Sequence, residues 1–141
     1  MPIRSVRSVV AGQTPVTGAR TATVLEAAML MQRQGKGALL VVEGARLIGI
    51  VTERDIVFRV VAAGLDPRTT KLADVMTPQP QTIQPDKPFS HALRIMHEGG
   101  FRHVPVVEND RPLGVVSSRD ALDDDFYELR ADMVQRGDER D

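Results

Sequence analysis

The sequence predicts an α+β fold made of two tandem copies of one β-α-β-β-α unit. An internal repeat carries this prediction: shifting the chain by 65 positions aligns residues 26–55 with residues 91–120 without a gap, and 11 of the 30 aligned residues are identical. Hydrophobic patterns also follow one another in the same order in both copies. A unit of about 55 residues with one hairpin and two helices cannot bury its apolar faces alone, so we expect the copies to pack together.

Each copy begins with a short strand and an amphipathic helix. Short strands are expected at residues 15–17 and 82–83. Apolar residues at helical spacing between Val24 and Met31, and between Phe89 and Met96, predict the helices. Glycines at 35 and 99–100 follow the last turn and indicate where these helices end.

A β-hairpin and a second helix complete each copy. Two apolar runs, 38–42 and 47–51, predict one hairpin, and the runs 104–107 and 113–116 predict the other. The tips are expected at 44–45 and 109–110. Pro105 cannot donate a ladder hydrogen bond, so its strand is expected to lie at an edge or to leave that position unpaired. A second helix is expected after Thr52 and after Ser117.

These patterns divide the chain into four parts. We expect a first motif with the N-terminal segment (1–65), a linker with a short helix (66–76), a second motif (77–125) and an acidic C-terminal helix or tail (126–141). Residues 123–141 hold eight acidic residues against three basic ones, which indicates a solvated end of the chain.

Composition excludes several classes of function. The absence of cysteine excludes disulfides, thiolate metal sites and cysteine nucleophiles. A net charge of −1 offers nucleic acid no uniform field, and no apolar run approaches the ~18 residues of a membrane span. His91 and His97 lie six positions apart on a predicted helix and do not converge on a metal. We expect a cytoplasmic protein with no metal, no required cofactor, no nucleic-acid partner and no membrane partner.

One heptad occurs in both copies at the repeat offset. It reads Gly49-Ile50-Val51-Thr52-Glu53-Arg54-Asp55 and again Gly114-Val115-Val116-Ser117-Ser118-Arg119-Asp120. With the stretches 100–107 and 74–78, these heptads resemble the signatures of a CBS-domain pair, also called a Bateman module. The resemblance covers residues from about 10 to 125 and implies that the two copies pack about a pseudo-two-fold axis.

The resemblance implies two ligand sites between the copies. Thr52 and Asp55 would face Gln81, Thr82, Phe101, His103 and Pro105, with Phe101 and Pro105 beside a base and Arg102 and His103 near phosphate. The mirror site would use Ser117 and Asp120 with Thr17 and the segment that includes Gly37 and Ala38. Because Gly37 and Ala38 stand where the second copy has Arg102 and His103, unequal sites are expected. Arg54 and Arg119 are further candidates for phosphate contact.

Two interpretations of the Thr/Ser-x-x-Asp pattern stay open. The residues form a capping box if Thr52 and Ser117 only satisfy backbone amides where a helix begins. They form a nucleotide site if the free amides hold an anion and the carboxylate accepts the hydroxyls of a ribose.

We therefore expect a non-catalytic regulatory module that binds an adenine nucleotide (AMP, ADP or ATP) and signals by a conformational change to an unknown protein target. The alternatives are a sensor of NAD or S-adenosylmethionine, or a ligand-independent dimeric scaffold or inhibitor. No pattern of nucleophile and base, and no glycine-rich phosphate loop with lysine, suggests catalysis. The resemblance and the apolar helix faces also imply a homodimer.

Overall fold

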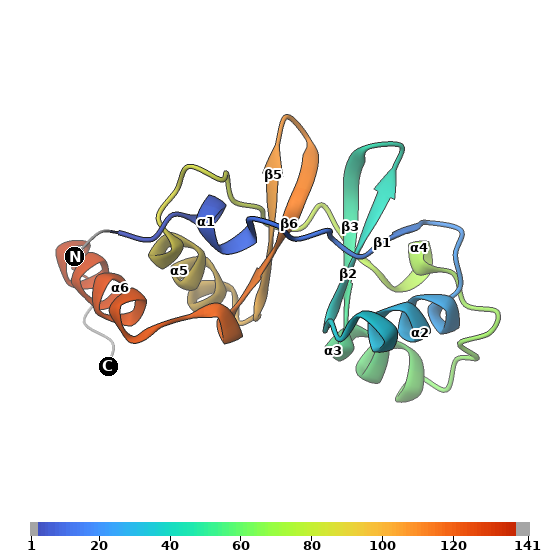
Figure 1. The fold of residues 1–141 in the computed structure, drawn as a ribbon. Coiled ribbons are helices and arrows are strands. Elements are labelled where there is room, and N and C mark those ends of the chain that lie inside the picture. The colour runs from blue at the N-terminus through green and yellow to red at the C-terminus, as the bar shows by residue number, and fades with distance from the viewer. Residues whose placement is uncertain (1–2, 138–141) are drawn as a thin grey trace. The chain divides into compact units, whose positions relative to one another are not determined.

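The computed structural model describes residues 3–137 and confirms the mixed helix and strand class. Figure 1 follows the chain through its helices and strands. The elements are, in order, α1 (Val6–Val10), β1 (Thr17–Ala19), α2 (Val24–Gln34), β2 (Ala38–Glu43), β3 (Arg46–Thr52), α3 (Glu53–Ile56), the π-helix η1 (Val57–Val61), α4 (Leu72–Val75), β4 (Thr77–Pro78), α5 (Phe89–Gly99), β5 (His103–Glu108), β6 (Arg111–Ser117), the 3₁₀-helix η2 (Ser118–Asp120) and α6 (Asp123–Gln135).

The chain folds into two compact units, each built around one copy of the repeat. The first unit contains residues 14–80 and the hairpin tip at 109–113. The second unit contains residues 81–108, the chain from Gly114 onward and the segment before Thr14. The sequence analysis assigned this N-terminal segment to the first motif, whereas its contacts are with the second copy of the repeat. The amide of Val6 donates to the Lys87 carbonyl oxygen at 2.8 Å, and Val6 and Val10 are buried.

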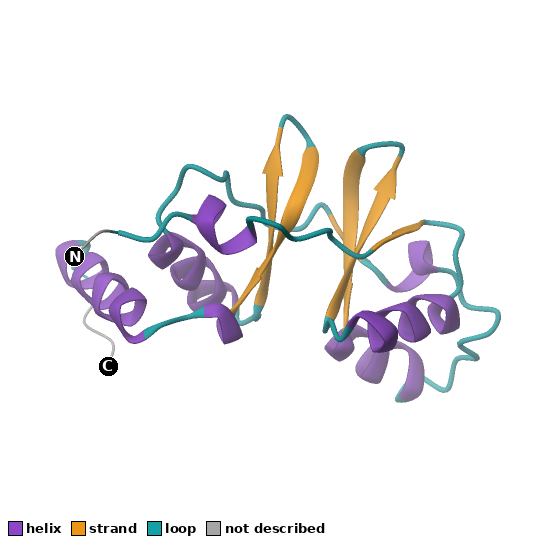
Figure 2. Cartoon of the chain, viewed as in Figure 1, coloured by secondary structure: helices purple, strands orange, loops and turns teal. Residues whose placement is uncertain are grey.

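In the first unit, a four-stranded sheet has the order β1-β2-β3-β4. Strand β1 runs parallel to β2, and β2 pairs with β3 in the antiparallel direction, with Ala38 opposite Thr52. Helices gather on one side of these strands in Figure 2. The core between helices and sheet consists of Val16, Val24, Ala27, Met31, Leu39, Val41, Val51, Val60, Leu72 and Val75.

In the second unit, β5 and β6 form a hairpin, and α5 packs against α6 and α1. Phe89 and Ala92 of α5 and Val104 and Val106 of β5 are fully buried. Ile83 forms a parallel bridge with Val106, so this residue takes the place of the short strand expected at 82–83. Strand β5 has β6 on one side and the Ile83 bridge on the other, so the expected edge position of Pro105 is wrong; the Pro105 carbonyl oxygen accepts the Ile83 amide, and the ladder has no donor at Pro105.

The helix ends and hairpin tips follow the sequence prediction. Left-handed Gly35 and Gly100 cap α2 and α5. The second hairpin turns at Asn109 and Asp110, which have φ angles of 53° and 64°. These positive values match the right-handed twist of the flanking strands, which explains why a two-residue turn closes the hairpin.

The helix expected directly after Ser117 is wrong, because only the 3₁₀ turn η2 follows and α6 begins at Asp123. Asp125 explains the break. Its Oδ2 accepts the Leu122 amide at 2.8 Å and pairs with Arg4 Nη1 at 2.5 Å, while the same Nη1 donates to the Asp120 carbonyl oxygen at 3.2 Å. These bonds satisfy the backbone on both sides of Ala121 and start a new helix. Residues 138–141 of the expected tail lie outside the described residues.

Within residues 3–137, none of the helices has both the length and the apolar character needed to cross a membrane.

The loss of folding stability of the second unit at acidic pH is expected to depend on His91 of α5. Burial and then the Arg94 guanidinium lower the pKa of His91; Asp132 opposes them, and Lys87 and Arg136 add smaller contributions that lower it further. Protonation therefore favours the unfolded chain, where the imidazole titrates near its ordinary value of about 6.5. The stability contributed by neutral His91 is fully present above about pH 6.5 and is lost as the pH falls through and below that value.

Urea unfolding of the wild type and of His91→Gln at pH 7.5 and pH 5.5 tests this expectation. His97 and His103 are common to both proteins, so the difference between their pH dependences isolates His91. The variant should lose less stability on acidification. Identical losses in the two proteins would contradict the assignment.

Candidate functional site

The first signature forms a reciprocal capping box at the end of β3. Thr52 Oγ1 accepts the Asp55 amide at 3.2 Å, and Asp55 Oδ2 accepts the Thr52 amide at 2.9 Å. The capping interpretation of this motif is therefore present in the structure. It leaves the Asp55 carboxylate with unused acceptor positions, since a carboxylate offers about four lone pairs. The Asp55 side chain keeps 12% of its surface exposed.

The start of β2 lies against this signature. Ala38 pairs with Thr52 across the sheet, and the Glu53 amide donates to the Gly37 carbonyl oxygen at 3.0 Å. Thr17 of β1 lies opposite Leu40, two residues further along β2. The first unit thus brings Gly37, Ala38 and the signature to one end of its sheet, with Thr17 on the neighbouring strand.

Arg54 of the first signature is held over an aromatic ring. Its guanidinium carbon lies 5.1 Å from the centroid of the Phe58 ring, one turn along the same helical segment. Both side chains are exposed. The contact is a cation–π interaction worth about 0.5–1 kcal/mol at an exposed site, so a phosphate could recruit Arg54 at small cost.

The second signature repeats the amide–carboxylate bond of the first but differs in its hydroxyl and in the helix that follows. The Ser117 amide donates to Asp120 Oδ2 at 2.8 Å, and Ser117 Oγ lies 3.4 Å from the same oxygen. The Ser118 amide donates to the Arg102 carbonyl oxygen at 3.1 Å, which corresponds to the Glu53–Gly37 bond of the first unit. Only the single 3₁₀ turn η2 follows Ser117, so the run of free amides expected at a helix N-terminus is short.

The second unit also gathers the other predicted residues near β5. The Ile83 amide donates to the Pro105 carbonyl oxygen at 3.0 Å, which places Gln81 and Thr82 just before the segment that runs beside β5. His103 begins β5, directly after the exposed Arg102. The Phe101 ring folds back on the end of α5 and lies so close to Gly99 that a Cβ there would be only 2.1 Å from it.

Each unit therefore holds its own set of candidate residues. The first set is Thr17, Gly37, Ala38, Thr52, Arg54 and Asp55. The second set is Gln81, Thr82, Phe101, Arg102, His103, Pro105, Ser117, Arg119 and Asp120. The second set carries Arg102 and His103 where the first has Gly37 and Ala38, so the two sets differ in cationic side chains.

Two matched segments of the chain decide its family. Residues 6–62 and residues 72–125 each match the CBS domain family. The chain belongs to the CBS domain family. Its internal repeat is thus a pair of CBS motifs, and the heptads that end in Asp55 and Asp120 are their signatures.

This CBS pair is similar in sequence to a protein from Methanopyrus kandleri. Protein MK0525 of Methanopyrus kandleri is 34% identical over 120 residues, which cover 84% of this chain and 61% of that protein. This chain thus spans less than two thirds of that relative's length.

Two solved structures similar to this CBS pair contain adenosine ligands. CBS domain protein PAE2072 from Pyrobaculum aerophilum, complexed with AMP, has a TM-score of 0.81 and 27% identity, covering 91% of this chain and 99% of that one. The CBS pair of protein MJ0100, in complex with 5′-methylthioadenosine and S-adenosyl-L-methionine, has a TM-score of 0.74 and 26% identity, covering 93% and 98%.

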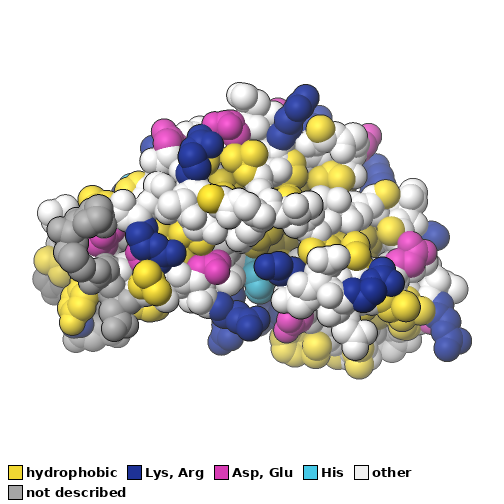
Figure 3. Space-filling view, in the orientation of Figure 1, with side chains coloured by type: hydrophobic (Ala, Val, Ile, Leu, Met, Phe, Trp, Pro, Cys, Tyr) yellow, Lys and Arg dark blue, Asp and Glu magenta, His cyan; other side chains and the backbone are white. Residues whose placement is uncertain are grey.

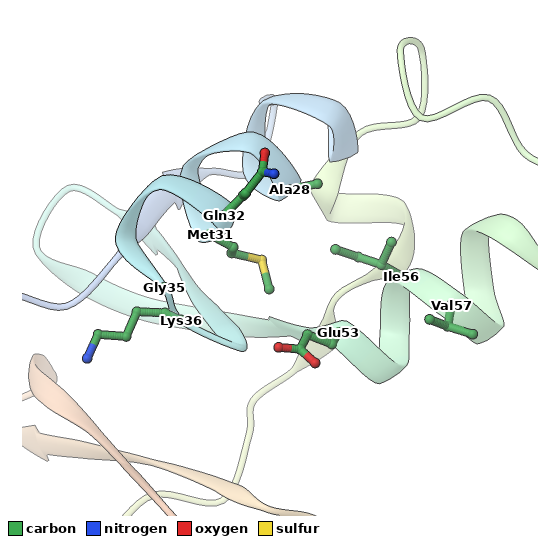
Figure 4. Close-up of a pocket in the computed structure, with 8 residues that line it drawn as sticks. All are labelled: Ala28, Met31, Gln32, Gly35, Lys36, Glu53, Ile56 and Val57. Carbon is green, nitrogen blue, oxygen red and sulfur yellow. The ribbon is translucent and has the colours of Figure 1, made fainter.

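The first CBS motif also has a pocket that the sequence analysis did not predict. It has a volume of about 370 Å³, lies between α2 and α3 and is lined by Ala28, Met31, Gln32, Gly35, Lys36, Glu53, Ile56 and Val57. Figure 4 shows Met31 and Ile56 directed into the space between the helices, while the Lys36 side chain extends away from it. The lining is mainly apolar, so the pocket offers few groups for orienting a charged ligand.

Sequence reasoning also missed Arg59, which follows Asp55 by one helical turn. Arg59 Nε lies 3.6 Å from Asp55 Oδ1, and Arg59 Nη1 donates to the carbonyl oxygens of Val75 and Met76 at 3.1 and 3.2 Å. The i,i+4 spacing of Asp55 and Arg59 was a usable signal for the ion pair. The carbonyl partners leave no such signal.

Neither the surface charge nor the metal-ligating side chains among the described residues point to a further site beside the two sets of candidate residues. On the face drawn in Figure 3, basic and acidic side chains are interspersed. Among the side chains that the structure describes, no group of three or more His, Asp or Glu residues could hold a metal ion.

Proposed function

We propose that this CBS pair is a non-catalytic regulatory module that binds an adenine nucleotide, with AMP as the first candidate. The carboxylate of each signature carries the proposal. Asp55 and Asp120 are fixed by a backbone amide through one oxygen, which leaves acceptor positions for two vicinal hydroxyls. The ligands of PAE2072 and MJ0100 share an adenosine with a ribose, which supports this class of ligand.

The phosphate is proposed to select among adenosine ligands. Arg54 and Arg119 belong to the signatures, Arg102 and His103 lie at the start of β5, and a guanidinium binds phosphate through a planar pair of N–H groups. The pairing of Thr52 and Asp55 with residues of the second copy stays a prediction. Binding would signal by favouring one conformation over another, and the protein that receives this signal is unknown.

Isothermal titration calorimetry with AMP, ATP, NAD and S-adenosylmethionine tests the proposal. Saturable binding of AMP or ATP is expected, with a loss of roughly thirty-fold in affinity when the carboxylate that contacts the ribose is removed by Asp55→Ala or Asp120→Ala. Arg102→Ala in each background shows which carboxylate shares a ligand with Arg102. Arg33→Ala, an exposed change on α2, is the control and should leave the affinity unchanged.

The alternative is a dimeric scaffold that needs no ligand. Large apolar side chains are exposed on α2 and η1, including Met29 (48%), Phe58 (58%) and Val61 (69%), and such a face is typical of a surface that another protein covers. These residues support the proposed homodimer whether or not a ligand binds. Absence of binding of all four compounds at millimolar concentration would overturn the sensor and favour the scaffold.

A further inference from the structure

Arg59 joins the Asp55 carboxylate to the main chain that precedes β4. Its Nε faces Asp55 Oδ1 at 3.6 Å, while its Nη1 donates to the Val75 and Met76 carbonyl oxygens at 3.1 and 3.2 Å. Val75 is buried at 2% exposure, so one of these acceptors belongs to a fixed part of the first unit. A guanidinium is planar, and bonds on one edge therefore fix the direction of the other.

The same geometry leaves Asp55 open to a ligand. Oδ2 is occupied by the Thr52 amide at 2.9 Å, and the 3.6 Å separation between Oδ1 and Nε is that of an ion pair rather than a short hydrogen bond. Oδ1 thus keeps its lone pairs while the charge of Arg59 restricts where it points. A carboxylate held at both oxygens needs little reordering to accept two hydroxyls, and avoiding that cost increases affinity.

The second CBS motif lacks this arrangement. At the repeat offset, the residue that corresponds to Arg59 is Asp124. An arginine also reaches the second signature, but Arg4 donates to the main-chain carbonyl of Asp120 rather than to its carboxylate. The side chain of Asp120 is held by Ser117. The two carboxylates therefore differ in what orients them.

We infer that Arg59 is a positioning residue that presets the Asp55 carboxylate for the vicinal hydroxyls of a ribose. This inference rests on the proposed function, because it assigns Asp55 the ribose of the nucleotide. It predicts that Arg59 acts on the recognition of the diol and not on the rest of the ligand.

The experiment compares AMP with 2′,3′-dideoxy-AMP, which lacks both hydroxyls, by calorimetry in the Asp120→Ala background. Arg59→Gln should weaken AMP binding roughly ten-fold and leave the affinity for the dideoxy nucleotide nearly unchanged, so that the ratio of the two affinities falls roughly ten-fold. Arg59→Lys keeps the charge but cannot reach both sets of oxygens, so it should recover only part of the ratio. Arg33→Gln, an exposed arginine of the same unit, should leave the ratio at its starting value.

The outcomes separate the two proposals. If the wild type binds none of the nucleotides, the proposed function fails. If the Asp120→Ala protein binds AMP but Arg59→Gln lowers both affinities equally, or neither, Arg59 is only structural and the inference is overturned. Loss of all AMP binding in the Asp120→Ala background overturns the inference too, because Asp55 then binds no ribose. Urea unfolding of each variant identifies any general loss of structure.

Discussion

Replacing Asp125 by alanine is expected to destabilise the second unit by about 3 kcal/mol, which corresponds to a melting temperature lower by roughly 10 °C. Asp125 is 1% exposed and pairs with Arg4 at 2.5 Å. Its removal leaves the Arg4 guanidinium without a carboxylate at a site that is only 29% exposed, and it also removes the acceptor for the Leu122 amide. Breaking a buried pair from one side costs more than the pair contributes, because the remaining charge stays desolvated.

Arg7 provides a matched control for this prediction. Its ion pair with Glu108 also joins the N-terminal segment to the rest of the second unit, at the end of β5, but the two side chains are 57% and 47% exposed. Arg7→Ala should therefore cost less than 1 kcal/mol. Urea unfolding followed by circular dichroism measures both variants. A change below 1 kcal/mol for Asp125→Ala would show that the Arg4 pair contributes little to stability.

The Asp125 pair also shows where sequence reasoning ends. The hairpins and the helices α2 and α5 could be predicted, because hydrophobic period and turn residues act within a dozen positions. Arg4 and Asp125 are 121 residues apart, and nothing in either local sequence announces their contact. The break between η2 and α6 depends on that contact. The same limit hides the place of α1, since its partners near Lys87 are remote in the chain.

The candidate site divides in the same way. The capping boxes could be predicted, because each lies within four residues of chain. The ion pair between Arg59 and Asp55 could also have been predicted, because the two residues are four positions apart on a helical segment. The hydrogen bonds from Arg59 to the main-chain carbonyls of Val75 and Met76 could not, because any residue type supplies such a carbonyl. The sequence motif therefore indicates the carboxylate but not the group that orients it.

The two signature glycines supply the second large expected effect, a destabilisation of about 2 kcal/mol on Gly114→Ala. A Cβ at Gly114 would lie 2.9 Å from Val10 Cβ and 2.7 Å from Gln13 Oε1. Val10 is buried at 5% exposure in α1, and Gln13 Oε1 accepts the Val115 amide at 3.1 Å. Neither neighbour can retreat without losing packing or a hydrogen bond, so the added methyl strains the contact between α1 and β6.

Gly49→Ala is the matched change in the first CBS motif and should cost less. There the nearest atom to an added Cβ is Met76 Sδ at 2.5 Å, with the Thr77 carbonyl oxygen at 3.2 Å. An unbranched thioether can rotate away, so most of the clash is relieved by one side chain. Urea unfolding of the two variants should give the order Gly114→Ala more destabilised than Gly49→Ala. The reverse order would show that α1 yields more easily than Met76, and that the close approach of α1 to Gly114 does not hold the second unit together.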